Sequence, residues 1–254
     1  METLAADQTH GGRPPFSRSD ESRCPLPPES LTPPHPLAHV SWIGGPPDAG
    51  KSTVAQILAD RLGARFYQQD RHEREHLRRA TPDRHPLHVE FRHQLETLDE
   101  AGFAEYMWVQ RSVPEIATAS RANWVERLDL VCADLVDLGA TPPIIAEGPG
   151  LFPAPLLHHL PAGAHVVWLI PTDEFKQASH RRRGKSAWAH LTSDPDRARR
   201  QHIERDLLLA EMYRTELRAL GRPWITIDGQ RSVESIADQI LKEWATKEAS
   251  PGSR

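Results

Sequence analysis

The sequence feature that most restricts the fold is a glycine-rich loop at residues 45–52, which matches the pattern G-x-x-x-x-G-K-S. The apolar residues 38–43 before the loop predict a β-strand. After the loop, apolar residues recur with the spacing of one helix face, at Val54, Ile57, Leu58 and Leu62. A strand, a glycine-rich turn and a helix in this order form the context in which the pattern binds phosphate groups. The loop therefore predicts an α/β domain with an anion site where the helix begins.

The residue types in this loop explain the expected chemistry. Glycines allow successive backbone N–H groups to face one anion, and the helix that follows adds the positive end of its dipole. Lys51 is expected to reach the β and γ phosphates of ATP, and the Ser52 hydroxyl to bind Mg²⁺. The carboxylate of Asp48 must point away from the phosphates. The predicted nucleotide-binding residues are Gly45, Asp48, Ala49, Gly50, Lys51, Ser52 and Thr53.

The rest of the chain alternates between short apolar runs and helical patterns. Further strands are predicted at residues 65–69, 144–146, 165–170 and 224–227. Residues 87–138 are expected to be mostly helical, and Val233 begins a closing helix. Apolar strands that are separated by helices favour a parallel sheet of about five strands, covered by helices on both faces.

The distribution of proline indicates where the domain begins. Eight prolines fall within the first 36 residues, a stretch with few apolar residues. We expect a disordered proline-rich leader at residues 1–37, a folded domain at 38–246 and a flexible tail at 247–254.

Composition excludes several classes of protein. The chain of 254 residues has no apolar run long enough for a spanning helix, so no membrane role is expected. Its two cysteines, Cys24 and Cys132, are too few for a disulfide framework, which favours a reducing, cytoplasmic location. The net charge of −4 argues against nucleic acid as a partner.

On its phosphate loop and layout, the chain resembles the small-molecule and nucleotide kinases of the P-loop superfamily, such as shikimate, gluconate, adenylylsulfate and nucleoside monophosphate kinases. The base-reading motif N-K-x-D of regulatory GTPases does not occur. The resemblance covers about residues 38–245, and only the phosphate loop is specific. It implies a three-layer kinase-like fold with a helical insertion and a lid, and transfer of the γ-phosphoryl group of MgATP to a small-molecule hydroxyl or phosphate.

The resemblance also implies roles for four residues outside the loop. Asp70, after the second strand, would orient the acceptor and take its proton, although it could instead cap a helix. Glu147, after the third strand, would hold Mg²⁺, the alternative being a polar loop residue. Arg181 and Arg183 would belong to an arginine-bearing lid, with further arginines at 197, 199, 200 and 205. The alternative for these arginines is a solvated basic helix.

A second motif competes with the kinase interpretation. Residues 72–76 read His-Glu-Arg-Glu-His, which is the H-E-x-x-H pattern of zinc hydrolases. Its flanks are basic rather than apolar, and no third ligand is evident, so zinc hydrolysis remains a remote alternative. The same residues could instead line the acceptor pocket or form a charged surface helix.

The main alternative from a different class is a nucleotide-dependent switch that lacks a small acceptor. A polynucleotide kinase is a third possibility. The sequence identifies neither the acceptor nor the oligomeric state.

Overall fold

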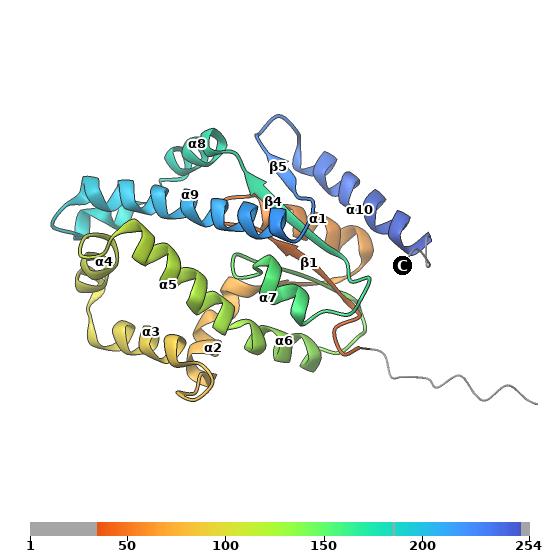
Figure 1. Cartoon of the computed structure of the whole chain (residues 1–254), viewed down its shortest axis with the longest axis horizontal. Helices are drawn as coiled ribbons and strands as arrows, with labels where there is room; N and C mark the ends of the chain where they lie inside the picture. Colours follow the sequence, from red (N-terminus) through yellow and green to blue (C-terminus); the bar gives the residue numbers. More distant parts are fainter. Residues whose placement is uncertain (1–34, 185, 250–254) are drawn as a thin grey trace, which may run out of the picture. The chain divides into compact units, whose positions relative to one another are not determined.

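A five-stranded sheet organises the computed structural model, which describes residues 35–184 and 186–249. The strands are β1 (Val40–Gly44), β2 (Arg65–Gln68), β3 (Ile144–Gly148), β4 (Val166–Pro171) and β5 (Ile225–Ile227). Their spatial order is β2-β3-β1-β4-β5, and every neighbouring pair is parallel. The predicted α/β fold with a parallel sheet is therefore confirmed (Figure 1).

Helices connect and cover the strands. The α-helices are α1 (Lys51–Leu62), α2 (Glu73–Arg79), α3 (Pro86–Thr97), α4 (Glu100–Trp108), α5 (Val113–Glu126), α6 (Leu128–Asp137), α7 (Pro153–His158), α8 (Asp173–Arg183), α9 (Pro195–Ala219) and α10 (Val233–Ala249). Two 3₁₀ helices, η1 (Gln69–His72) and η2 (Ala187–Leu191), follow β2 and α8.

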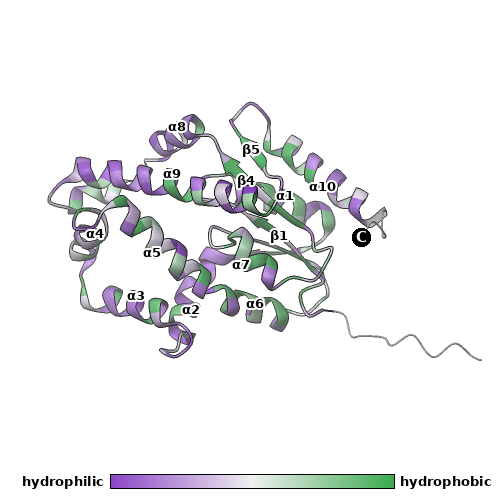
Figure 2. Ribbon diagram, in the orientation of Figure 1, coloured by the Kyte–Doolittle hydropathy of each residue, from purple (hydrophilic) through white to green (hydrophobic). Residues whose placement is uncertain are grey.

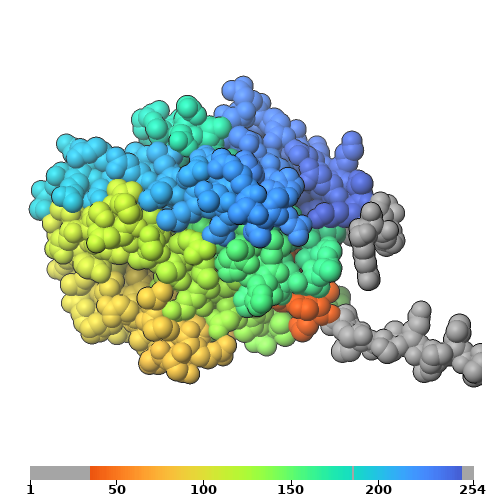
Figure 3. Space-filling model, viewed as in Figure 1, coloured from red at the N-terminus to blue at the C-terminus, as the bar shows by residue number. Residues whose placement is uncertain are grey.

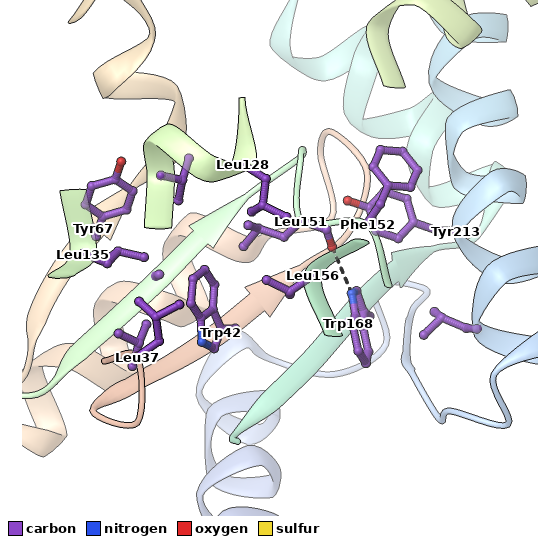
Figure 4. Close-up of a cluster of buried hydrophobic side chains, with 14 of the residues drawn as sticks. Leu37, Trp42, Tyr67, Leu128, Leu135, Leu151, Phe152, Leu156, Trp168 and Tyr213 are labelled. Carbon is purple, nitrogen blue, oxygen red and sulfur yellow. Dashed lines mark hydrogen bonds between the residues drawn. The ribbon is translucent and has the colours of Figure 1, made fainter. Parts of the chain in front are cut away.

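Alternation along the strands sends side chains to two hydrophobic cores. On one face, Trp42 and Trp168 pack with residues of α5, α6, α7 and α9, among them Leu128 and Tyr213 (Figure 4). On the other face, Ile43 and neighbouring strand residues pack against α1 and α10. The hydropathy colouring shows the strands as green and α8 as largely purple (Figure 2). The sheet is thus the middle layer of a three-layer α/β fold.

The predicted helical region at residues 87–138 consists of four helices, α3 to α6. Local capping explains two of the breaks. The Asp99 side chain accepts a hydrogen bond from the backbone of Gly102 at the start of α4. Ser112 and Glu115 form a capping box at the start of α5. These four helices, α3 to α6, are called the insertion below. Within the insertion, α4 and α5 pack against α9, and Figure 3 shows this yellow-green region beside blue.

The limits of the folded domain differ slightly from the prediction. Leu37, which was predicted to lie in the leader, is 4% exposed and belongs to the hydrophobic core. It is an apolar residue close to the start of β1, so its side chain is buried together with that strand. Helix α10 continues to Ala249, so the first part of the expected tail is helical. The rest of the leader and tail, residues 1–34 and 250–254, lies outside the described residues. Within the described residues, no helix has both the length and the apolar character to cross a bilayer.

Candidate functional site

The glycine-rich loop connects β1 to α1 and depends on two glycines with positive φ. Gly45 has φ of 135°, and a Cβ atom there would lie 2.1 Å from the carbonyl oxygen of Leu169. Gly50 has φ of 77° and immediately precedes the first residue of α1. The conformation of Gly45 brings the loop close to β4, and that of Gly50 allows α1 to begin directly after the loop. The free N–H groups at the start of α1 can then bind an anion.

Lys51 lies at the start of α1 and is buried. Its ammonium group donates a hydrogen bond to the carbonyl oxygen of Pro46 at 2.9 Å, within the same loop. Burial lowers the pKa of Lys51, while the carboxylates of Glu147 and Asp70 oppose that shift. A phosphate anion would add a further negative partner and stabilise the charged ammonium form.

Ser52 and Glu147 meet beside the loop. The Ser52 hydroxyl donates to Glu147 Oε1 at 2.9 Å and accepts from Gln68 Nε2 at 3.1 Å. The parallel register, which pairs Ile43 with Glu147, brings the end of β3 beside the end of β1. Burial raises the pKa of Glu147, and the nearby ammonium of Lys51 opposes this rise. A hydroxyl and a carboxylate are oxygen ligands of the kind that Mg²⁺ prefers, so the pair fits the predicted metal site.

Asp70 belongs to η1, immediately after β2, and its side chain is exposed. It lines the same cavity as Lys51 and Glu147. Its neighbour Gln69 is fixed on two sides: the Arg127 guanidinium donates to the Gln69 carbonyl oxygen, and the Gly150 N–H donates to Gln69 Oε1 at 3.0 Å. These contacts hold the turn that presents Asp70 to the cavity.

A buried charge cluster joins the loop to α8 and α9. Lys176 is 1% exposed, and its ammonium donates to Asp48 Oδ2 at 2.6 Å and to Asp206. Arg183 also contacts Asp48, at 3.2 Å. Burial opposes ionisation of Asp206, but Arg205 and Lys176 lower its pKa overall. The carboxylate of Asp48 is therefore committed to these cations of the domain. Neither Lys176 nor Asp206 was among the predicted site residues, because neither belongs to a motif in the sequence.

The structure separates the two predicted lid arginines. Arg183, at the end of α8, is half-exposed and lines the cavity. Arg181 lies on the same helix, is exposed, and is not among the residues that line the cavity. Arg205 of α9 does line it, with its guanidinium 4.9 Å from the ring centre of Trp108. Arg183 and Arg205, unlike Arg181, could therefore approach a phosphate bound in this cavity.

A cavity of about 1010 Å³ contains these groups. Six of the predicted nucleotide-binding residues line it, namely Asp48, Ala49, Gly50, Lys51, Ser52 and Thr53, whereas Gly45, at the start of the loop and close to Leu169, does not. The insertion supplies the far wall, with Phe91 from α3, Tyr106 and Trp108 from α4 and Trp124 from α5. The sequence analysis assigned none of these aromatic residues to the site. A detectable signal was the spacing of Leu87, Phe91 and Gln94, which places all three on one face of α3.

The H-E-x-x-H residues serve a different purpose from zinc binding. His76 is fully buried; its Nδ1 accepts from Arg127 at 2.6 Å, and its Nε2 lies 2.7 Å from the Asp134 carboxylate. His72 stacks on Tyr67, with ring centres 4.3 Å apart. Among the described residues, no group of three His, Cys, Asp or Glu side chains is placed to hold a metal ion. Both ring nitrogens of His76 are therefore already used in packing α2 against α6.

Comparison with known proteins yields structural likeness only. The chain matches no model of a protein family, and it matches no curated protein. Among solved structures, it is similar to a shikimate kinase from Acinetobacter baumannii in complex with shikimate, with 16% identity and a TM-score of 0.43. The match covers 83% of this chain and 95% of that one.

Proposed function

We propose that this protein is an ATP-dependent phosphotransferase, which moves the γ-phosphoryl group of MgATP to a small-molecule hydroxyl or phosphate. One observation carries the proposal: the phosphate loop, the acid Asp70 and the wall of the helical insertion all face one cavity of about 1010 Å³. That volume exceeds what the phosphates alone require, and it leaves room for an acceptor. A nucleotide switch without a small acceptor has no need for such a space beside its loop.

Each residue of the loop would have a distinct task. The backbone N–H groups at the start of α1 would bind the phosphates, and Lys51 would exchange its bond to Pro46 for the β and γ phosphates. Ser52 and Glu147 would hold Mg²⁺, which supplies charge neutralisation between the phosphates when bound. In this arrangement Arg183 and Arg205 would neutralise the negative charge that develops on the transferring group.

Asp70 would act on the acceptor. Its carboxylate is exposed to the cavity and lies on the turn that Arg127 holds through the carbonyl oxygen of Gln69. A carboxylate in this position can orient an acceptor hydroxyl and accept its proton as the bond to phosphorus forms. The aromatic wall would exclude water, which otherwise competes as an acceptor.

The variant Asp70→Asn tests this assignment. We expect it to lose acceptor-stimulated release of ADP by at least about a hundredfold, because it cannot accept the proton. Its affinity for MgATP should stay within about twofold of the wild type, since the phosphate loop is unchanged. The matched control is Glu75→Gln on α2, whose carboxylate pairs with Arg78 and does not line the cavity. Full stimulated turnover in Asp70→Asn would remove Asp70 from the mechanism.

A further inference from the structure

The insertion gives the cavity an apolar wall that is rich in aromatic side chains, opposite the glycine-rich loop. Phe91 of α3 meets Phe103 of α4 edge to face, with ring centres 5.8 Å apart. Tyr106, Trp108 and Trp124 continue this wall along α4 and α5. Each of these five side chains is only partly buried, so part of its surface remains available to a ligand. Such a wall favours a ligand with a ring or another large apolar body.

The charged groups that α2 and α3 contribute to the cavity lining are both carboxylates. Glu73 and Glu90 line the cavity from α2 and α3, and neither helix contributes a cation to its lining. Glu90 accepts a hydrogen bond from the neutral amide of Gln94 at 3.0 Å, and it forms no ion pair with any described residue. Glu73 lies 3.5 Å from Arg127, and burial raises the pKa of its carboxyl group. A cationic ligand group could form an ion pair with either carboxylate, and it would stabilise the charged form of Glu73.

The cations that line the cavity lie elsewhere. Arg183 and Arg205 belong to α8 and α9, which lie apart from α2 and α3 in Figure 1. The guanidinium of Arg111 donates to the carbonyl oxygen of Glu115 at 3.0 Å and lies 5.5 Å from the ring centre of Tyr106. A ligand with a carboxylate or phosphate at the α2 and α3 end would therefore face carboxylates rather than cations.

From this arrangement we infer that the phosphoryl acceptor is an amino alcohol with an apolar ring, whose amine lies near Glu73 and Glu90 and whose ring contacts the insertion wall. The inference rests on the proposed phosphotransfer. In the reaction, the hydroxyl oxygen of the acceptor forms a bond to the γ phosphorus as the bond to the β-phosphate oxygen breaks. The hydroxyl proton passes to Asp70, and ADP and a phosphate ester leave.

Three small probes separate the two parts of this inference. Phenylalaninol carries a ring, an amine and a hydroxyl group; 3-phenyllactate carries a ring, a hydroxyl group and a carboxylate but no amine; and alaninol lacks the ring. Their binding to the full-length protein is measured by calorimetry, with MgATP absent, and release of ADP is measured separately. We expect phenylalaninol to bind at least about tenfold more tightly than either of the others, since one charged contact and one ring each contribute at least that much.

Two variants assign the contacts. Glu90→Gln, which keeps the shape but removes the charge, is expected to weaken binding of phenylalaninol about fivefold to tenfold. A fourth probe, 2-phenylethanol, has the ring and the hydroxyl but no amine, and its affinity for Glu90→Gln should stay within about twofold of the wild type. Phe91→Ala is expected to weaken binding of both phenylalaninol and 2-phenylethanol. Tighter binding of 3-phenyllactate than of phenylalaninol, equal binding of alaninol, or no binding of phenylalaninol at about 10 mM would each overturn the inference.

The two proposals fail in different ways. If phenylalaninol binds as expected but no amino alcohol stimulates release of ADP, the proposed phosphotransfer is wrong and the binding class stands. If only carboxylate-bearing or phosphate-bearing alcohols stimulate release of ADP, phosphotransfer stands and the acceptor class is wrong.

Discussion

The ammonium group of Lys176 lies 2.6 Å from the carboxylate of Asp48, which ties the glycine-rich loop to helix α8 across 128 positions of the sequence. Asp48 has a φ of 64°, which is uncommon for residues other than glycine, although Asn and Asp adopt it more often than the rest. The same ammonium also contacts Asp206 of α9. One lysine thus joins the loop to the two helices that carry Arg183 and Arg205.

Replacing this lysine should destabilise the domain. Lys176→Met leaves the buried carboxylates of Asp48 and Asp206 without their shared cation, so we expect the free energy of unfolding to fall by about 3–5 kcal/mol. The matched control is Arg61→Met, which breaks a solvent-exposed ion pair with Asp238 and should cost less than about 1 kcal/mol. Urea unfolding measures both values. Equal losses in the two variants would show that the buried cluster contributes no more than a surface pair.

The close approach of the loop to β4 predicts a strong effect at Gly45. An alanine there would place its Cβ atom 2.1 Å from the carbonyl oxygen of Leu169, at a φ of 135°. We expect Gly45→Ala to lower the free energy of unfolding by at least about 3 kcal/mol. Gly63→Ala is the control: its φ is also positive, at 60°, but nothing lies within 4 Å of the new Cβ, so the cost should be about 1 kcal/mol. A loss at Gly45 no larger than at Gly63 would contradict the packing described here.

Two histidines, the fully buried His88 and the partly buried His202, predict sensitivity to acid. Burial lowers the pKa of His202 to about 3 and that of His88 to about 4, both below the ordinary value of 6.5. Below pH 6.5 the unfolded chain binds protons that the folded chain does not, so the free energy of unfolding falls with decreasing pH. We expect the two histidines together to lower the free energy of unfolding by about 3–4 kcal/mol between pH 7 and pH 5. His202→Gln should reduce this slope, whereas His93→Gln, an exposed position, should leave it unchanged. A flat profile in the wild type would contradict the prediction.

Much of the fold could be predicted from the sequence because its signals are local. The five strands, the loop and α1 each depend on short runs of apolar residues, glycines and caps, and the structure places them within a residue or two of the expected limits. The breaks between α3, α4, α5 and α6 were harder to place, since they depend on caps such as Asp99 and on packing against α9.

The candidate site could be predicted only where its residues are contiguous in the sequence or follow neighbouring strands of the sheet. The residues of the loop are contiguous, and the acids Asp70 and Glu147 end strands that neighbour each other, so topology alone suggested their meeting. The partners of His76, namely Arg127 and Asp134, lie 51 and 58 positions away, and no local pattern connects them. The aromatic wall of the cavity likewise combines residues from three separate helices, α3, α4 and α5.

Binding of MgATP at the loop is the central claim, and calorimetric titration of the purified full-length chain tests it most directly. We expect one MgATP per chain in the wild type. In Lys51→Ala the affinity should fall by about tenfold to a hundredfold, because a charged hydrogen bond to phosphate is lost. Thermal unfolding without nucleotide checks that the variant is folded. An absence of MgATP binding in the wild type, or equal affinity in a folded Lys51→Ala variant, would contradict the account.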